Sequence, residues 1–398
     1  MSVRARARAA ITFSTLAILV IGCGPNDQGS PRGAVIEVLP NGVVWVENTP
    51  LPEGDTFTTF VGEEDLRIGS IAGGGPDEFS RIGTFTVDDQ GTMYIVDGMA
   101  EDIRVFDSEG TYIRTFGGKG EGPGEFGNAT GMTWGPEGNL WVYESRRFSV
   151  FTPEGEFLTS YPREVRGVLS PWPGKFGPEG RLWDFGVDRP EAAGNSPGTL
   201  IRYTVRRTSR DFSTFDTLKS LDFRTGDLLP SQARPPYQDA LTRFLAPRGF
   251  FWFARTRDNR VYQVTPDYDT VRGFSIPIGP VPVSNFEVDS ILAAYNRPGR
   301  PFRLEADAIP ETKTLIRRIL MDDRDNIIVF PIASREDQNK AFLMFDPDGV
   351  FLGRGRLENR AYQSPHPLFK GGNVYSVVTD ELDISYLVRE RIVQRESR

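Results

Sequence analysis

Few residues of the chain have the chemistry that catalysis or metal binding usually needs. Its 398 residues include one histidine, His366, and one cysteine, Cys23. A single histidine excludes a zinc site with several histidine ligands, and it leaves one candidate base for a Ser-His-Asp triad, in the turn-like context Ser-Pro-His-Pro. We therefore predict no catalytic residue, no metal site and no cofactor. A non-catalytic protein is favoured, and the question of an activity stays open.

Charged side chains that follow three aromatic strand residues are the predicted binding residues. Asp97, Glu144 and Arg255 each stand three positions after such an aromatic residue. Arg146 and Arg257 follow closely. Several strands that deliver polar groups to one rim could build a pocket on a rigid scaffold. The alternative is structural, since an Asp often caps its own turn.

Two segments resemble ligand-binding loops and have simpler explanations. Residues 322–326 (DDRDN) are rich in oxygen ligands but lack the Gly and the distal Glu of an EF-hand. They match residues 88–91 in register, which predicts a turn in which Asn326 takes the left-handed conformation. Residues 120–126 (GEGPGEF) could suggest a phosphate loop, but a strand follows where such a loop needs a helix.

One repeated unit organises the elements that must position these residues. Residues 73–151 contain it twice, as GGGPDEF, DDQGTMYIVD and IRVFDSEG, and as GEGPGEF, GPEGNLWVYE and FSVFTPEG. Phe126 follows Phe79 by 47 positions, and Gly138 follows Gly91 by 47. Short alternating apolar runs that end in Gly turns at such a period are typical of β-propeller blades.

A turn Gly or Asn followed three places later by a large apolar residue marks the second strand of each blade. The pairs are Gly91/Tyr94, Gly138/Trp141, Gly180/Trp183, Gly249/Trp252, Asn326/Val329 and Gly372/Tyr375. A further match, Gly42/Trp45, has no complete blade around it. We predict an all-β fold, a six-bladed β-propeller with four-stranded antiparallel blades; seven blades stay an alternative. Residues 66–71 would complete the sixth blade, whose other strands lie within 369–392, and this closure would remove a sheet edge.

Two short, partly helical insertions interrupt this pattern near residues 225–244 and 280–311. A helix is expected over residues 237–245 in the first. The second opens with a capping box from Ser284 to Glu287, places Phe286, Ile291 and Tyr295 at helical spacing, and stops at Pro298 and Gly299. Both insertions belong with the second-to-third turns of the blades, so this loop-rich face is the predicted binding surface. Alternatively, the helices only cap the channel mouth.

The N-terminus predicts export and a lipid anchor. Arg4, Arg6 and Arg8 precede an apolar stretch that is too short to span a bilayer and ends in Val-Ile-Gly-Cys. This ending resembles a bacterial lipobox, which implies a signal peptide over residues 1–22 and lipid modification of Cys23. Residues 23–33 form a flexible tether, and residues 34–398 a single propeller domain. An ordinary secretory signal with an incidental Cys is the alternative.

The overall charge argues against one class of partner. The chain has 46 basic and 54 acidic residues and a net charge of −8, with no basic run. Binding to nucleic acid is therefore disfavoured.

The strings GPGEF, DDQGTMYIVD, IRVFDSEG and GPEGNLWV resemble the NHL-type repeat family, and more closely bacterial six-bladed propeller lipoproteins with such repeats. The family includes binding scaffolds and enzymes, among them amidating lyases, whose metal-binding histidines have no counterparts here. The prediction is a lipid-anchored protein of the bacterial cell envelope, periplasmic or on the outer membrane. It would bind a protein or small-molecule ligand on its loop-rich face. A propeller hydrolase or lactonase that depends on a divalent cation is the alternative, and a purely structural envelope protein is a third possibility.

Overall fold

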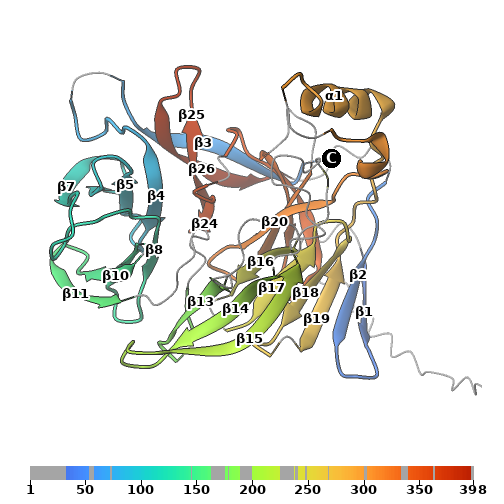
Figure 1. Ribbon diagram of the computed structural model, residues 1–398, viewed down its shortest axis with the longest axis horizontal. Helices are drawn as coiled ribbons and strands as arrows, with labels where there is room; N and C mark the ends of the chain where they lie inside the picture. Colours follow the sequence, from blue (N-terminus) through green and yellow to red (C-terminus); the bar gives the residue numbers. More distant parts are fainter. Residues whose placement is uncertain are drawn as a thin grey trace, which may run out of the picture.

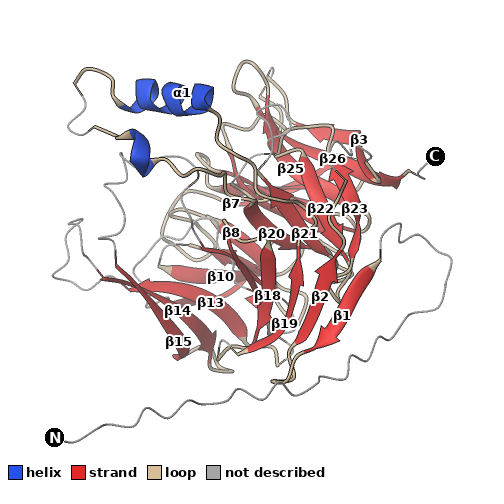
Figure 2. Cartoon of the chain, turned by 90° about the vertical axis from the view of Figure 1, so that its right-hand side faces the viewer, coloured by secondary structure: helices blue, strands red, loops and turns tan. Residues whose placement is uncertain are grey.

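The computed structural model describes residues 33–52, 58–71, 74–144, 146–162, 175–177, 179–188, 200–224, 237, 241–246, 249–267, 269–299, 303–332, 339–361 and 364–395. The predicted signal peptide, Cys23 and all of the tether except Gly33 lie outside these residues. Almost all of the regular secondary structure in the described residues is β strand (Figure 2). No helix in it is long and apolar enough to cross a membrane.

Three sheets consist of four antiparallel strands that follow one another along the chain. The first sheet contains β4 (Ile82–Val87), β5 (Met93–Asp97), β6 (Asp102–Phe106) and β7 (Tyr112–Gly117). The second contains β8 (Gly131–Trp134), β9 (Leu140–Tyr143), β10 (Arg147–Phe151) and β11 (Phe157–Pro162). The third contains β12 (Lys175–Phe176), β13 (Leu182–Asp188), β14 (Leu200–Thr208) and β15 (Phe215–Arg224).

A fourth sheet starts in the same way and gains two strands from the N-terminal part of the chain. Its sequential strands are β16 (Leu241–Leu245), β17 (Phe251–Arg255), β18 (Arg260–Val264) and β19 (Thr270–Ser275). β2 (Val44–Asn48) pairs in parallel with β19, and β1 (Ala34–Val38) pairs with β2. The strand pattern around Trp45 therefore belongs to an added pair of strands at a sheet edge, which the sequence did not predict.

The fifth sheet has eight strands because two four-stranded runs are joined at their edges. One run is β20 (Ile316–Met321), β21 (Ile327–Pro331), β22 (Ala341–Phe345) and β23 (Phe351–Arg356). The other is β24 (Leu368–Lys370), β25 (Asn373–Thr379), β26 (Ser385–Gln394) and β3 (Phe60–Ile68). The predicted pairing of an N-terminal strand with the last strands is confirmed, since β3 pairs antiparallel with β26. β3 also pairs in parallel with β23, so the prediction of separate four-stranded blades is wrong at this edge and at β19.

The first strand of each run lies toward the middle of the molecule. These inner strands are β4, β8, β12, β16, β20 and β24. Figure 1 shows β4, β8, β16, β20 and β24 toward the middle, and β7, β11, β15 and β1 toward the outside. Inner strands of successive runs also contact one another, β4 with β8, β8 with β12, and β16 with β20.

Buried apolar clusters connect each run of strands to the next. Tyr94 of β5 packs with Leu140 of β9, and further clusters link the runs that follow. The last run packs against the first, because Tyr375 of β25 and Leu387 of β26 share a cluster with Met93 of β5. The contacts therefore close on themselves, and each run buries both faces against neighbours.

The predicted second strands are present, with a shift of one residue in the fifth. The six predicted pairs open β5, β9, β13, β17, β21 and β25. In the fifth pair, Asp325 and not Asn326 takes the left-handed conformation, with a φ of 65°, whereas Gly91 has 87° at the matching place. Both are the fourth residue of a turn closed onto an Asp carbonyl, Asp88 or Asp322. The turn hydrogen bond thus determines which residue takes the left-handed conformation. Asp adopts this conformation almost as readily as Asn.

A helix was predicted in each of the two insertions, and the second of these predictions agrees better with the structure. The helix expected over residues 237–245 is wrong at its end, because residues 241–245 form β16 and pair with β17. In the second insertion α1 (Asn285–Tyr295) begins with the predicted capping box, in which Ser284 and Glu287 bond each other's backbone. The helix ends before Pro298, but its apolar residues do not form a buried side, since none is buried and Phe286 is 78% exposed. Figures 1 and 2 show α1 outside the sheets. The short helix η2 (Ala306–Ala308) follows it.

Candidate functional site

Asp97, a predicted binding residue, is buried at the end of β5, and its carboxylate is occupied by groups of its own turn, of the crossing before the sheet and of β6. Its carboxylate accepts hydrogen bonds from the backbone N–H groups of Ser80 (3.0 Å) and Met99 (3.0 Å) and from the Ser80 hydroxyl. Arg104 lies 3.2 Å away as its ion-pair partner. Burial raises the pKa of Asp97, but the hydrogen bonds outweigh burial and hold the pKa below its usual value.

Glu144 repeats this arrangement in the second sheet. Its carboxylate accepts from the Gly127 backbone N–H (3.0 Å), from Arg147 Nε (3.0 Å) and from the Ser149 hydroxyl (2.8 Å). Arg147 also donates to the carbonyl of Glu125, as Arg104 does to that of Glu78. Each acid–arginine pair therefore fastens the glycine-rich crossing before its sheet. The structural alternative accounts for these contacts of Asp97 and Glu144.

The other three predicted residues are arginines on the surface. Arg146, Arg255 and Arg257 are all exposed. None of the five predicted residues lines the pocket described next. The structure thus does not gather them there, and their role in binding stays a prediction.

A pocket of about 630 Å³ opens between the second and third sheets, and we call it the inter-sheet cleft. The second sheet contributes the turn before β9, the edge strand β11 and parts of β9 and β10. The third sheet contributes the turns before β13 and β15. The lining residues are Pro136, Glu137, Asn139, Trp141, Val150, Leu158, Thr159, Tyr161, Glu179, Gly180, Arg210, Asp211 and Phe212. This volume falls in the range of small-molecule sites.

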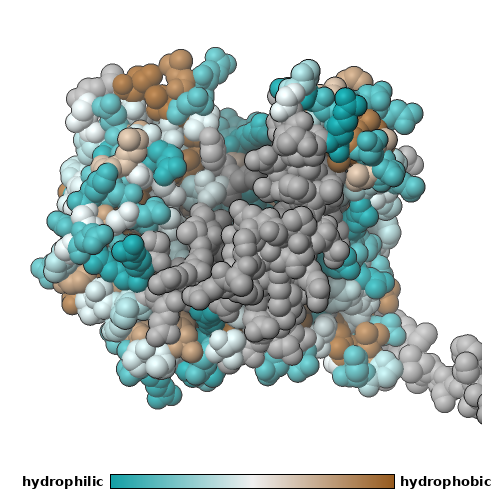
Figure 3. All heavy atoms as spheres, viewed as in Figure 1, coloured by the Kyte–Doolittle hydropathy of each residue, from teal (hydrophilic) through white to brown (hydrophobic). Residues whose placement is uncertain are grey.

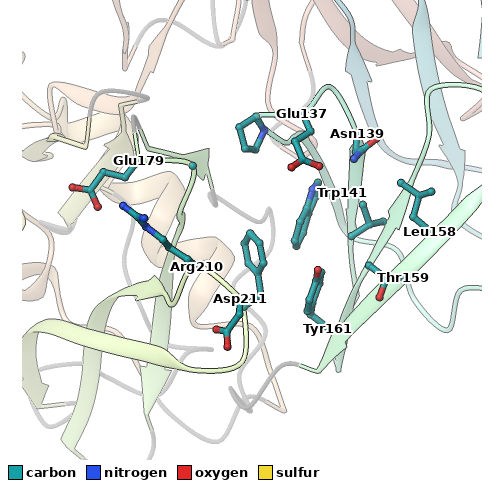
Figure 4. Close-up of a pocket in the computed structure, with 13 residues that line it drawn as sticks. Glu137, Asn139, Trp141, Leu158, Thr159, Tyr161, Glu179, Arg210 and Asp211 are labelled. Carbon is teal, nitrogen blue, oxygen red and sulfur yellow. The ribbon is translucent and has the colours of Figure 1, made fainter.

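Aromatic rings form the floor of the inter-sheet cleft. Trp141 and Tyr161 are stacked, with centroids 5.3 Å apart and planes within 3°. The Phe212 ring lies 4.6 Å from that of Trp141 and 4.9 Å from that of Tyr161. Alternation along β11 places Thr159 and Tyr161 on one side of the strand, toward the third sheet. Figure 4 shows Trp141 and Tyr161 on one side of the opening, opposite Arg210 and Asp211.

A tight turn presents Phe212 to these rings. Phe212 has a φ of 57°, and its N–H donates to the carbonyl of Ser209 at 3.2 Å. Asp211 braces the turn, because its carboxylate accepts from the hydroxyls of Ser209 (2.5 Å) and Ser213 (2.8 Å). These two hydroxyls are the main cause that lowers the pKa of Asp211 to about 2. The side chain is thus ionised at every physiological pH.

The rim of the inter-sheet cleft is mainly acidic. Glu137, Glu179 and Arg210 are exposed, and Asp211 is ionised beside them. Figure 4 shows Glu179 and Arg210 on the third-sheet side and Glu137 above Trp141. Three carboxylates against one guanidinium give the opening a negative character. An apolar floor with a charged rim can orient a ligand that has an apolar and a positive part.

Sequence reasoning missed the inter-sheet cleft because it considered the other set of turns. The cleft is built at first-to-second and third-to-fourth turns, at residues 136–139, 179–180 and 210–212. The sequence analysis predicts binding at the second-to-third turns and makes no prediction for these residues. The available signal was an aromatic residue inside a turn, Phe212, which a simple closure does not need. Most of residues 225–244 lie outside the described residues, so ligand binding on the loop-rich face stays a prediction.

Other candidate sites are weaker. No three His, Cys, Asp or Glu side chains in the described ranges are grouped so as to hold a metal ion. The segment DDRDN is a turn, in which Asp322 accepts from the backbone of Arg324 (2.9 Å) and Asn326 (2.8 Å), as predicted. On the face in Figure 3, hydrophobic residues form small patches separated by hydrophilic ones.

Comparison with known proteins identifies the fold. No family model and no curated protein sequence matches the chain, so the NHL resemblance stays a prediction. Solved structures do match. A DUF4221 family member from Bacteroides vulgatus aligns over 85% of this chain and 99% of its own, with a TM-score of 0.53 and 9% identity.

Two further structures align with lower scores. The calcium-binding protein regucalcin from Agrobacterium tumefaciens covers 85% of this chain and 97% of its own, with a TM-score of 0.42 and 11% identity. Virginiamycin B lyase from Staphylococcus aureus covers 89% of this chain and 87% of its own, with a TM-score of 0.36 and 13% identity. The DUF4221 family member, whose TM-score is above 0.5, is a β-propeller-like protein. The chain has a β-propeller-like fold. At such identities the likeness extends to the fold and not to an activity.

Proposed function

We propose that this protein is a six-bladed β-propeller, exported and anchored through Cys23, that binds a ligand in the inter-sheet cleft. Each run of four strands would be one blade, with β3 as the outer strand of the sixth. The cyclic order of the apolar clusters supports this count, because the last run packs on the first. In this arrangement β1, β2 and β3 also shield the outer edges of two blades.

The inter-sheet cleft is the observation that carries the proposal. The partly buried rings of Tyr161 and Phe212 pack on the buried Trp141 and leave the floor of the cleft aromatic, and a strained turn presents Phe212 there. A non-Gly residue in the left-handed region marks strain, and such strain often accompanies ligand sites. Few catalytic groups are at hand, so binding is the function that this geometry supports.

The aromatic floor and the acidic rim of the inter-sheet cleft together indicate the class of ligand. The floor offers apolar and aromatic contacts through Tyr161 and Phe212, while the rim offers the carboxylates of Glu137, Glu179 and Asp211. A peptide with an aromatic side chain next to a basic one meets both demands. Its ring would lie on the floor, and its cation would lie among the rim carboxylates, where exposed ion pairs give orientation more than affinity.

The test uses two dipeptides that differ only in charge. Ac-Phe-Arg-NH2 and Ac-Phe-Glu-NH2 are titrated into the protein by calorimetry at low ionic strength. We expect saturable binding of the first and at least tenfold weaker binding of the second. Phe212→Ala should weaken binding of Ac-Phe-Arg-NH2 at least tenfold, and Glu179→Gln about threefold. Phe286→Ala, which removes an equally large but remote exposed ring, is the matched control. Equal affinities for both peptides, no saturable binding, or equal losses in Phe212→Ala and Phe286→Ala would refute the proposal.

A further inference from the structure

The inner strands carry positive charge and no negative charge. Their sequences are IGTFTV (β4), GMTW (β8), KF (β12), LTRFL (β16), IRRILM (β20) and LFK (β24). They contain five basic residues and no Asp or Glu, in a chain whose net charge is −8. Figure 1 shows β4, β8, β16, β20 and β24 toward the middle of the molecule, and β12 contacts β8, so these basic positions lie on strands of the middle.

Lys175 on β12 has no negative partner in the described part of the chain. Its ammonium nitrogen lies 5.3 Å from the centroid of the Phe244 ring on β16, and this is its only recorded favourable contact. Burial is the main cause that lowers the pKa of Lys175, and the charge of Lys370 lowers it further. The residue is nevertheless half-buried and not fully enclosed. Lys175 thus lies on an inner strand and keeps some contact with solvent.

Lys370 on β24 shows how the chain neutralises a comparable cation. Its ammonium group pairs with Asp89 at 2.7 Å and donates to the carbonyl of Val87 at 2.9 Å. Its charge still reaches Lys175. Arg318 on β20, whose guanidinium lies 5.5 Å from the Phe330 ring centroid, is a third buried cation of the inner strands. Of these two lysines, Lys370 has a carboxylate partner and Lys175 has none in the described part of the chain.

We propose that the middle of the molecule binds an oxyanion, with the ammonium group of Lys175 as its main contact. A buried charge without a partner is unfavourable, and it is relieved by loss of its proton or by a counter-ion. The inner strands bring further positive charge and no carboxylate that would repel an anion. A lysine binds the oxygens of a carboxylate, a phosphate or a sulfate as a point charge, so these groups share the recognising chemistry. This site is separate from the inter-sheet cleft and does not depend on it.

Titrations with sulfate, phosphate and succinate test the site and distinguish its ligands. Each anion is added at constant ionic strength with chloride as the balancing ion, and binding is followed by the melting temperature and by calorimetry. We expect one saturable site for at least one of them, with a rise in melting temperature of about 2 °C at tenfold excess over Kd. Binding of succinate alone would identify a carboxylate ligand, and binding of sulfate and phosphate alone a tetrahedral oxyanion.

Lys175→Met supplies the decisive comparison, because it keeps the unbranched stem of the side chain and removes its ammonium group. We expect affinity for the bound anion to fall at least tenfold. In chloride alone, the variant should be as stable as the natural protein or more stable, since an unpaired cation is lost. Lys119→Met, on an exposed lysine, is the control and should bind unchanged. No saturable binding of any of the three anions, or an equal loss in both variants, would overturn the proposal. A Lys175→Met protein that is less stable in chloride would assign the lysine a structural role and also overturn it.

Discussion

The molecule contains two kinds of buried charge, and the difference between them separates structure from binding. Asp97 and Glu144 are buried with an arginine and several hydrogen-bond donors, and each pair fastens the crossing between two sheets. Lys175 is half-buried on an inner strand, and an aromatic ring is the one favourable contact of its ammonium group in the described part of the chain. A fully partnered charge is committed to the fold, whereas an unpartnered one can still take a ligand. Charge at a strand end is therefore not by itself a sign of a site.

Removal of one partner from an acid–arginine pair should have the largest effect on stability. Asp97→Ala leaves the N–H groups of Ser80 and Met99 without their acceptor and removes one of the two carboxylates that pair with Arg104, so we expect a loss of about 3 kcal/mol in the free energy of unfolding. Chemical denaturation measures it. Glu154→Ala, on an exposed carboxylate, should change stability by less than about 0.5 kcal/mol. If Asp97→Ala behaves like Glu154→Ala, the pair does not hold the crossing.

Glu390 provides an intermediate case, a buried carboxyl group without a cation. It accepts from the backbone N–H groups of Glu358 (2.7 Å) and Asn359 (2.9 Å), where β3, β26 and the segment after β23 meet. Burial raises the pKa of Glu390 above its usual value, despite these two hydrogen bonds. The folded state therefore binds the proton more tightly than the unfolded state. This contribution to stability is complete below the unfolded pKa and is lost as the pH rises through the folded pKa.

Glu390→Gln tests the direction of this pH effect on stability. We expect the variant to lose the change in the free energy of unfolding that occurs between the unfolded and folded pKa of Glu390. The free energy of unfolding of both proteins is measured between pH 4 and 8, and their difference should shift in favour of the variant as the pH rises. A difference that is constant across this range, or that shifts in favour of the natural protein, would contradict the assignment.

The lipid anchor should have the smallest effect on the fold. Cys23→Ala should leave the melting temperature unchanged, because a tether of about ten residues separates it from the first strand. The variant should lose lipid labelling. A protein that starts at Gly24 behind a cleavable secretory signal should be released from membranes, as fractionation would detect. Membrane attachment of this protein in high salt would mean that the propeller binds membranes itself.

The sequence allowed prediction of the repeated elements and not of their exceptions. Gly turns and aromatic positions placed the second strands, since local turn chemistry determines them. The capping box at Ser284 was predicted for the same reason. The addition of β2 to β19 and of β3 to β23 could not be predicted, because parallel pairing at an edge depends on which segments meet in space. For the same reason a helix was wrongly predicted at residues 241–245, which form a strand because they pair with β17.

The residues of the two proposed sites were harder to predict than the strands. Position in the repeat correctly indicated that Asp97 and Glu144 are equivalent, but it carried no information on their partners. The inter-sheet cleft combines β9 and β11 with a turn more than fifty residues later, at Phe212. The excess of basic over acidic residues on the inner strands is visible only when all six strands are compared. Both features depend on contacts between runs, which a single repeat does not contain.

A crystal structure of the protein starting at Gly24, with Ac-Phe-Arg-NH2 bound, tests the central claim most directly. We predict that the phenyl ring lies against Tyr161 and Phe212 and that the guanidinium lies among Glu137, Glu179 and Asp211. Six runs of four strands should surround one axis in the same structure. A peptide bound elsewhere on the molecule, for example beside α1 on the loop-rich face, would contradict the assignment of the inter-sheet cleft as the binding site.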